Sequence, residues 1–180
     1  MTARAAMLAR RSRARVVGDD APDRAELLAL LEAAATVADH GGIAPWRVIE
    51  IRGTARYDLG RALAEGEGRA GSVSDKPLRA PLLLAVIASR RLSPKAPDWE
   101  QDATAAGVAH ALTLLLDEAG WGVIWRTGGA TRSEPVRILH NLGPNEDLLG
   151  WLYVGRPDAA KPPKPRDRID VASRLSSLGA

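Results

Sequence analysis

The sequence contains no cysteine, which excludes a disulfide framework, a thiolate metal site and a thiol nucleophile. Its three histidines, His40, His110 and His140, lack the spacing of metal ligands, so we predict no metal site. The amino terminus has no apolar segment of the secretory type, which favours a cytoplasmic protein. The apolar run at residues 103–116 is bounded by acidic residues and falls short of the roughly 20 residues of a bilayer span. We therefore expect no membrane partner.

Sequence motifs of enzymes are also scarce in this chain. It has no Gly-x-Ser-x-Gly nucleophile elbow and no Gly-x-x-x-x-Gly-Lys phosphate loop. Residues 66–71 match Gly-x-Gly-x-x-Gly, but a dinucleotide fingerprint follows a strand, whereas this segment follows an expected helix. We predict a loop there, and we assign no catalytic side chain.

The charged residues are unevenly distributed along the chain. The formal net charge is only +3, yet residues 1–15 contain five arginines and no acidic residue. The segment 156–168 adds further lysines and arginines near the other end. Two basic ends predict an anionic partner, either a nucleic acid or a phosphorylated small molecule.

The 180 residues suffice for one domain with a large core. Apolar patterns and turn residues predict helices at 1–8, 23–38, 56–65, 99–119 and 134–141, and strands at 47–51, 81–88, 121–126 and 148–154. The helix at 99–119 is apolar nearly all round, so we expect it to be buried, with small residues that allow a second helix or subunit to approach. The interleaved helices and strands predict an α+β sandwich.

Arginines beside hydroxyl groups are the most distinctive polar residues: Arg10 and Arg11 with Ser12, Arg126 with Thr127, and Arg166 in the tail. Guanidinium groups bind phosphate oxygens in a bidentate manner and stay charged at any working pH. Two or three of these arginines in one site would form a receptor for a phosphate monoester. We expect Trp46 and Trp125 to supply flat apolar walls for its ligand.

These residues resemble the flavin-dependent nitroreductases, most closely a compact bacterial subgroup that uses NAD(P)H. The resemblance rests on segments in a fixed order, namely Arg10-Arg11-Ser12, Asp39-His40, Pro45-Trp46, Arg79-Ala80-Pro81, Trp99-Glu100-Gln101, Gly120 with residues 124–128, and Leu152-Tyr153-Val154-Gly155. It implies an intertwined homodimer, in which helices flank a central, mostly antiparallel sheet. It also implies two FMN molecules at the interface, each contacted by both subunits.

The resemblance assigns roles to individual residues. The opening arginines and Ser12 would hold the phosphate and polar edge of FMN, and Arg166 would also bind the phosphate. His40 would contact the cofactor, and Thr36 shares its helix face one turn earlier. The expected cofactor-binding residues are Arg10, Arg11, Ser12, Thr36, His40, Trp125, Arg126, Thr127 and Arg166.

The chain departs from the family pattern at two positions. Ala44 stands where many members have glutamine before the Pro-Trp pair. Ala14 replaces the usual arginine two residues after the opening serine, although Arg13 and Arg15 flank it. The cation that faces the pyrimidine edge of the flavin is therefore left open.

From the resemblance we expect an FMN-dependent NAD(P)H oxidoreductase that reduces nitroaromatic or quinone-type acceptors by two electrons in a ping-pong cycle. Residues 1–155 would form the FMN-binding domain, and residues 156–180 an extended, basic, proline-rich tail that packs on the dimer. Two alternatives remain. One is a small basic nucleic-acid-binding protein, and the other is an FMN protein that acts as a dehydrogenase, with incidental nitro reduction.

Overall fold

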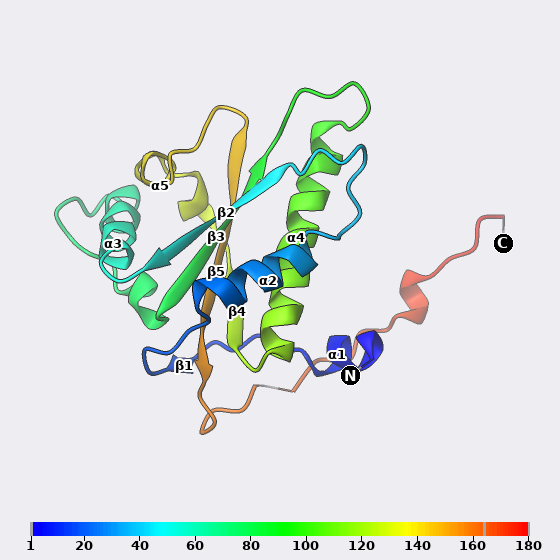
Figure 1. Ribbon diagram of the computed structural model, residues 1–180, viewed down its shortest axis with the longest axis horizontal. Helices are drawn as coiled ribbons and strands as arrows, with labels where there is room; N and C mark the ends of the chain where they lie inside the picture. The colour runs from blue at the N-terminus through cyan, green and yellow to red at the C-terminus, as the bar shows by residue number, and fades with distance from the viewer. Residues whose placement is uncertain (1, 164, 180) are drawn as a thin grey trace.

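The computed structural model describes residues 2–163 and 165–179 (Figure 1). Within them an antiparallel sheet lies between two groups of helices, which confirms the expected α+β architecture. The helices are α1 (Ala3–Ala9), α2 (Arg24–Ala34), α3 (Ala55–Gly66), α4 (Asp98–Glu118) and α5 (Glu134–Leu139), with short 3-10 turns at η1 (Lys76–Arg79), η2 (Gly129–Arg132) and η3 (Ala172–Arg174). The strands are β1 (Val16–Val17), β2 (Trp46–Arg52), β3 (Leu82–Ser89), β4 (Gly122–Arg126) and β5 (Glu146–Pro157).

Strand β3 lies inside the sheet and is flanked by β2 and β5, both antiparallel to it. The apolar run that predicts this strand is buried from Leu82 to Ala88, because helices cover both faces of the sheet. Strand β5 is long enough to pair on its other edge with β4 and then with β1. The segment 10–15 and strand β4 therefore lie at one edge of the sheet.

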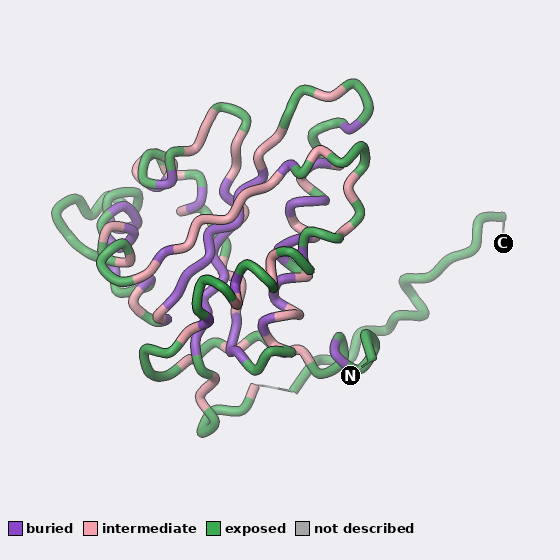
Figure 2. Tube along the Cα trace, viewed as in Figure 1, coloured by how far each residue is buried: buried purple, intermediate pink, exposed green. Residues whose placement is uncertain are grey.

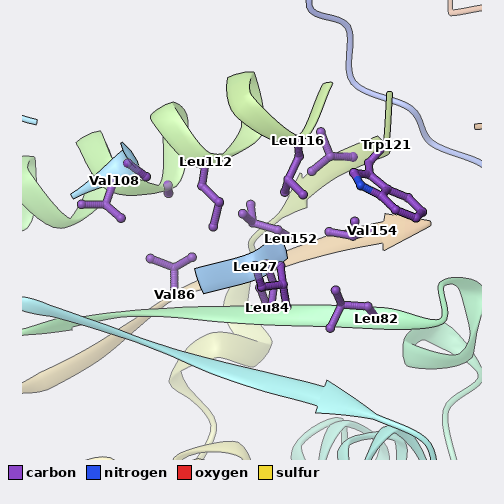
Figure 3. Packing of buried hydrophobic residues seen from close by; sticks show 13 residues of the cluster. Leu27, Leu82, Leu84, Val86, Val108, Leu112, Leu116, Trp121, Leu152 and Val154 are labelled. Carbon is purple, nitrogen blue, oxygen red and sulfur yellow. The ribbon is translucent and has the colours of Figure 1, made fainter. Parts of the chain in front are cut away.

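Two hydrophobic layers form on opposite sides of the sheet because successive side chains of a strand alternate between its faces. Leu84 and Val86 of β3 pack under α2 and α4, as Figure 3 shows for the first layer. Leu83 and Ile87 point the other way and pack against α3 and α5. Figure 2 shows this burial concentrated along the sheet and the inner sides of the helices.

Helix α4 is the long central helix that the sequence predicts. Leu112 is fully buried against the sheet, and the chain leaves the helix at Gly120, whose φ of +85° favours glycine. The prediction that this helix is buried on all sides is wrong for the single chain, because Trp99, Ala103 and His110 are exposed along one face of α4. Nothing in the described part of this chain covers that face, so its apolar composition calls for a further packing surface.

Among the differences from the sequence prediction, one strand was missed and one helix ends early. Strand β1 was not predicted, because two residues carry no pattern of their own and pair only with Arg156 and Pro157 at the end of β5. Helix α2 ends at Ala34 rather than at residue 38. Just beyond Ala34, the Thr36 hydroxyl donates a hydrogen bond of 2.8 Å to the Ala33 carbonyl. Such local bonds offer the backbone an alternative to continuing the helix.

The carboxyl-terminal tail leaves β5, passes α1 and projects away from the body (Figure 1). Most of its side chains are exposed, including the apolar Ile169, Val171 and Leu175. No helix among the described residues has the length and apolar character needed to cross a membrane.

Candidate functional site

A cavity of about 560 Å³, which we call the basic cavity, lies between β4 and the tail. Six cationic side chains line it: Arg10, Arg11, Arg13, Arg15, Lys161 and Arg166. The Arg13 N–H donates a hydrogen bond of 2.8 Å to the Val123 carbonyl, which holds this segment against β4. Ser12 and Ile124 complete the lining on that side. Cations from both ends of the sequence therefore meet in one cavity.

The tail is tied directly to the opening arginine motif. Arg166 Nη2 donates a hydrogen bond of 2.6 Å to the Arg10 carbonyl. Arg15 forms an ion pair of 3.3 Å with Asp158 in the same tail. The structure thus brings together Arg10, Arg11, Ser12 and Arg166, four of the predicted site residues. Lys164, a basic residue two positions before Arg166, lies outside the described residues.

A second cavity, of about 380 Å³, lies on the α3 side of the sheet, and we call it the tyrosine cavity. Its lining comprises Leu63, Lys76, Arg79, Arg126, Thr127, Ala130, Trp151 and Tyr153. Arg126 and Thr127 are predicted site residues, whereas Lys76 and Arg79 have no role predicted from the sequence. Both cations lie in η1, shortly before the buried strand β3. Arg79 also begins the Arg79-Ala80-Pro81 segment of the family resemblance, whereas Lys76 has no sequence signal besides its position.

Carboxylates hold the two η1 cations in place. The Glu67 carboxylate accepts a hydrogen bond of 2.6 Å from Lys76 Nζ and another from Arg69, and these two bonds hold the pKa of Glu67 at about 2. Arg79 pairs with Asp75 at 3.2 Å. Glu67 belongs to the Gly-x-Gly-x-x-Gly segment, which begins at the last residue of α3 and continues in turns, so the expected loop is confirmed.

Arg126 lacks a full set of partners. Its Nε is buried and has no hydrogen-bond acceptor in the described part of the chain. Its guanidinium carbon lies 5.4 Å from the ring centroid of Tyr153, whose pKa is raised by burial and lowered in part by Arg126 and Arg79. A buried N–H without an acceptor costs about 1–3 kcal/mol. The tyrosine cavity is therefore suited to a ligand that offers an acceptor to Arg126.

Trp125 points to the opposite face of β4 and lines neither cavity. Its ring meets the His110 ring edge-on at 5.2 Å, and its Nε1 also has no partner within the described residues. Trp46 packs on the same side, so neither tryptophan forms a wall of the two cavities, and their contact with a flavin stays a prediction.

The backbones of β4 and β5 approach closely at Gly150. A Cβ at Gly150 would lie 2.4 Å from the Arg126 carbonyl oxygen, so this approach is possible only because residue 150 is glycine.

The two cavities are neighbours along β4. Ile124 lines the basic cavity and Arg126 lines the tyrosine cavity, and these side chains share one face because they are two residues apart. At the usual rise of a strand their Cα atoms are about 7 Å apart. A ligand with a phosphate at one end and a planar ring at the other can therefore extend from one cavity toward the other.

His40 lies far from the basic cavity in the single chain, and neither Thr36 nor His40 lines either cavity. His40 Nδ1 lies 2.8 Å from the Glu100 carboxylate, near the start of α4. The Arg11 N–H instead reaches Asp117 near the end of α4, at 3.5 Å. Seventeen residues of α-helix separate Glu100 from Asp117, a distance of about 25 Å. One chain therefore does not bring His40 to the opening arginines.

A buried histidine supports one wall of the tyrosine cavity. Trp151 Nε1 donates a hydrogen bond of 3.1 Å to His140 Nε2, and His140 Nδ1 lies 2.8 Å from the Val136 carbonyl. This arrangement requires a neutral imidazole with its proton on Nδ1. Burial lowers the pKa of His140, with a smaller contribution from the nearby Arg47. Among the described residues no cluster of three acidic or histidine side chains is suited to a metal ion.

Fold and site together define a layered α+β protein with a cationic ligand site at the edge of its sheet. The model of the nitroreductase family matches residues 7–156, and the chain belongs to that family. YdjA of Escherichia coli K12, provisionally named an NAD(P)H nitroreductase, is 32% identical over 158 residues, which cover 84% of this chain and 86% of YdjA.

Solved structures show the same fold. A nitroreductase-like family protein from Bacillus cereus superposes with a TM-score of 0.83 at 23% identity, covering 100% of this chain and 98% of the other. A variant of NfnB from Sphigopyxis sp. strain HMH, described as an FMN and NADPH-dependent nitroreductase, gives a TM-score of 0.80 at 20% identity and covers both chains fully.

Proposed function

We propose that this chain is an FMN-dependent NAD(P)H oxidoreductase that reduces nitroaromatic or quinone-type acceptors. The observation that carries the proposal is the pair of adjacent cationic cavities, in which the Arg126 Nε is buried without an acceptor. Membership of the nitroreductase family and the names of YdjA and NfnB support the same cofactors.

The phosphate of FMN belongs in the basic cavity under this proposal. Arg10, Arg11 and Ser12 hold it from the β4 side, and Arg166 closes the cavity from the tail. Guanidinium groups suit this role because they match phosphate oxygens in pairs and keep their charge. The bond to the Arg10 carbonyl orients the Arg166 guanidinium beside the opening motif before the ligand binds.

The ring of FMN extends toward the tyrosine cavity, where Arg126 and Lys76 supply positive charge and Thr127 lies at the end of β4. When bound, FMN supplies the redox chemistry by taking two electrons from NAD(P)H and passing them to the acceptor in a ping-pong cycle. Fixed cations beside the ring stabilise the negative charge that it gains on reduction. Lys76 and Arg126 are therefore our candidates for the pyrimidine edge, in place of the missing arginine at Ala14.

A second copy of the chain completes the site. His40 lies about 25 Å along α4 from the opening arginines of its own chain, so we expect it, and Thr36 with it, to reach FMN across a dimer interface. The exposed face of α4 and the apolar residues of the tail supply surface for that interface. Residues 1–155 then form the FMN-binding domain, and residues 156–180 pack on the partner copy.

The placement of Trp121 and Trp151 does not favour nucleic-acid binding, whereas Trp99 at the start of α4 is exposed. Trp121 and Trp151 are 5% and 4% exposed, so neither offers a free face to a base. The Trp121 Nε1–H donates a hydrogen bond to Glu26, and the Arg156 guanidinium lies over one face of the Trp121 ring. The polar edge and one face of this ring are therefore already occupied.

Purification of the protein tests the proposal. We expect a yellow dimer with two FMN per dimer, whose flavin absorbance is bleached by NAD(P)H under anaerobic conditions and restored by a nitroaromatic or quinone. Absorbance and sedimentation velocity measure these quantities. A colourless protein that takes up no added FMN would overturn the proposed function. A monomer that binds FMN fully would overturn the shared site.

A further inference from the structure

The basic cavity contains more positive charge than one phosphate requires. Its six cations are opposed by Asp158, which pairs with Arg15, and by Asp117, which lies beside Arg11. A phosphate monoester adds about two negative charges, so about two positive charges remain. Because like charges in a concave site repel one another, a further anion bound there is stabilised.

The surplus positive charge of the basic cavity can be assigned to particular side chains. The Arg166 guanidinium donates a hydrogen bond of 2.6 Å to the Arg10 carbonyl, and both residues belong to the proposed FMN phosphate site. Arg13 and Lys161 line the same cavity, and within residues 2–163 and 165–179 neither side chain forms an ion pair. Two cations are thus left without an assigned anion.

The backbone fixes these two residues on different walls of the cavity. Arg13 is half-buried and is held at the edge of β4 by its N–H bond to Val123. Lys161 comes from the tail, where its N–H donates a hydrogen bond of 3.0 Å to the Asp158 carbonyl. An anion between them would therefore be gripped by a guanidinium on one side and an ammonium on the other.

We infer that Arg13 and Lys161 bind the 2′-phosphate of NADPH and so make this phosphorylated dinucleotide the preferred electron donor. The inference rests on the proposed function, which places FMN in the same two cavities. The nicotinamide must reach the flavin ring near the tyrosine cavity, and the basic cavity is the neighbouring cationic surface along β4. NADH has no 2′-phosphate, so it offers no anion to Arg13 and Lys161.

Calorimetry on the FMN-loaded protein at fixed ionic strength tests this inference. The ligands are 2′,5′-ADP and 5′-ADP, which carry the same number of phosphate groups in different positions. We expect 2′,5′-ADP to bind at least tenfold more tightly, and Arg13→Gln and Lys161→Gln each to weaken it by about tenfold. Arg61→Gln on α3 removes an equal charge from another surface and should change neither affinity.

Three results would overturn the inference: equal affinities for the two nucleotides, no loss in the Arg13→Gln protein, or displacement of 2′,5′-ADP by a short single-stranded DNA that binds more tightly. Circular dichroism and the flavin absorbance of each variant establish that it is folded and loaded. A protein that takes up no FMN instead overturns the proposed function, and the recorded absorbance keeps these two failures apart.

Discussion

The assignment of the FMN phosphate to Arg10 and Arg166 predicts that each guanidinium can be removed with a selective loss. Charge-assisted hydrogen bonds contribute about 1.5–3 kcal/mol, so Arg10→Ala should weaken FMN binding about ten- to hundredfold. Riboflavin, which lacks the phosphate, should bind the wild type and the variant equally. Arg166→Ala should lose at least as much, because it also removes the bond of 2.6 Å to the Arg10 carbonyl.

The assay is a pair of fluorescence titrations, with FMN and riboflavin, for each apoprotein at fixed ionic strength. Arg61→Ala is the matched control, since it removes an arginine from the exposed side of α3. An unfolded variant would lose both ligands and is recognised in that way. Equal losses for FMN and riboflavin in a folded Arg10→Ala protein would refute the phosphate assignment, and no loss for either would remove Arg10 from the site.

Two further predictions concern the walls of the tyrosine cavity. Gly150→Ala should destabilise the protein by at least about 1–3 kcal/mol, since its φ of +132° and the 2.4 Å approach to the Arg126 carbonyl exclude a Cβ. Chemical denaturation measures this loss of stability. The control is Gly129→Ala, which should be nearly neutral because a Cβ there would meet nothing within 4 Å. The lowered pKa of His140 means that the unfolded chain binds more protons, so its contribution to stability should be complete above about pH 6.5 and decline as the pH falls toward the folded pKa. Unfolding curves from pH 8 to pH 5 should show a shallower decline in His140→Gln, and an unchanged slope would contradict this assignment.

The elements that the sequence predicts well are those with a strong pattern of their own. Strand β3 is a continuous apolar run, and α4 combines apolar residues with acidic residues in its first turn and Gly120 after its end. Strand β1 could not be predicted, because its two residues become a strand only where the end of β5 passes beside them.

The candidate site was predictable only in part, because some of its residues are brought together by the fold and not by a local sequence pattern. Arg10, Arg11 and Ser12 are adjacent in sequence, so their common position follows from any fold. Lys76 and Arg126 meet because β3, β5 and β4 are neighbours in the sheet, an order that local pattern does not encode. The position of Thr36 and His40 in the site depends on a second copy and stays a prediction.

The bond between Arg166 and Arg10 joins residues that are 156 positions apart. During synthesis the opening arginines leave the ribosome first and must wait for the last part of the chain before their cavity has its second wall. The sheet can form from residues 46–157 in the meantime, since its pairings lie within that range apart from β1. Under the proposed phosphate assignment, the basic cavity is therefore complete only after the core has formed, and a chain that ends before residue 166 lacks the wall that Arg166 supplies.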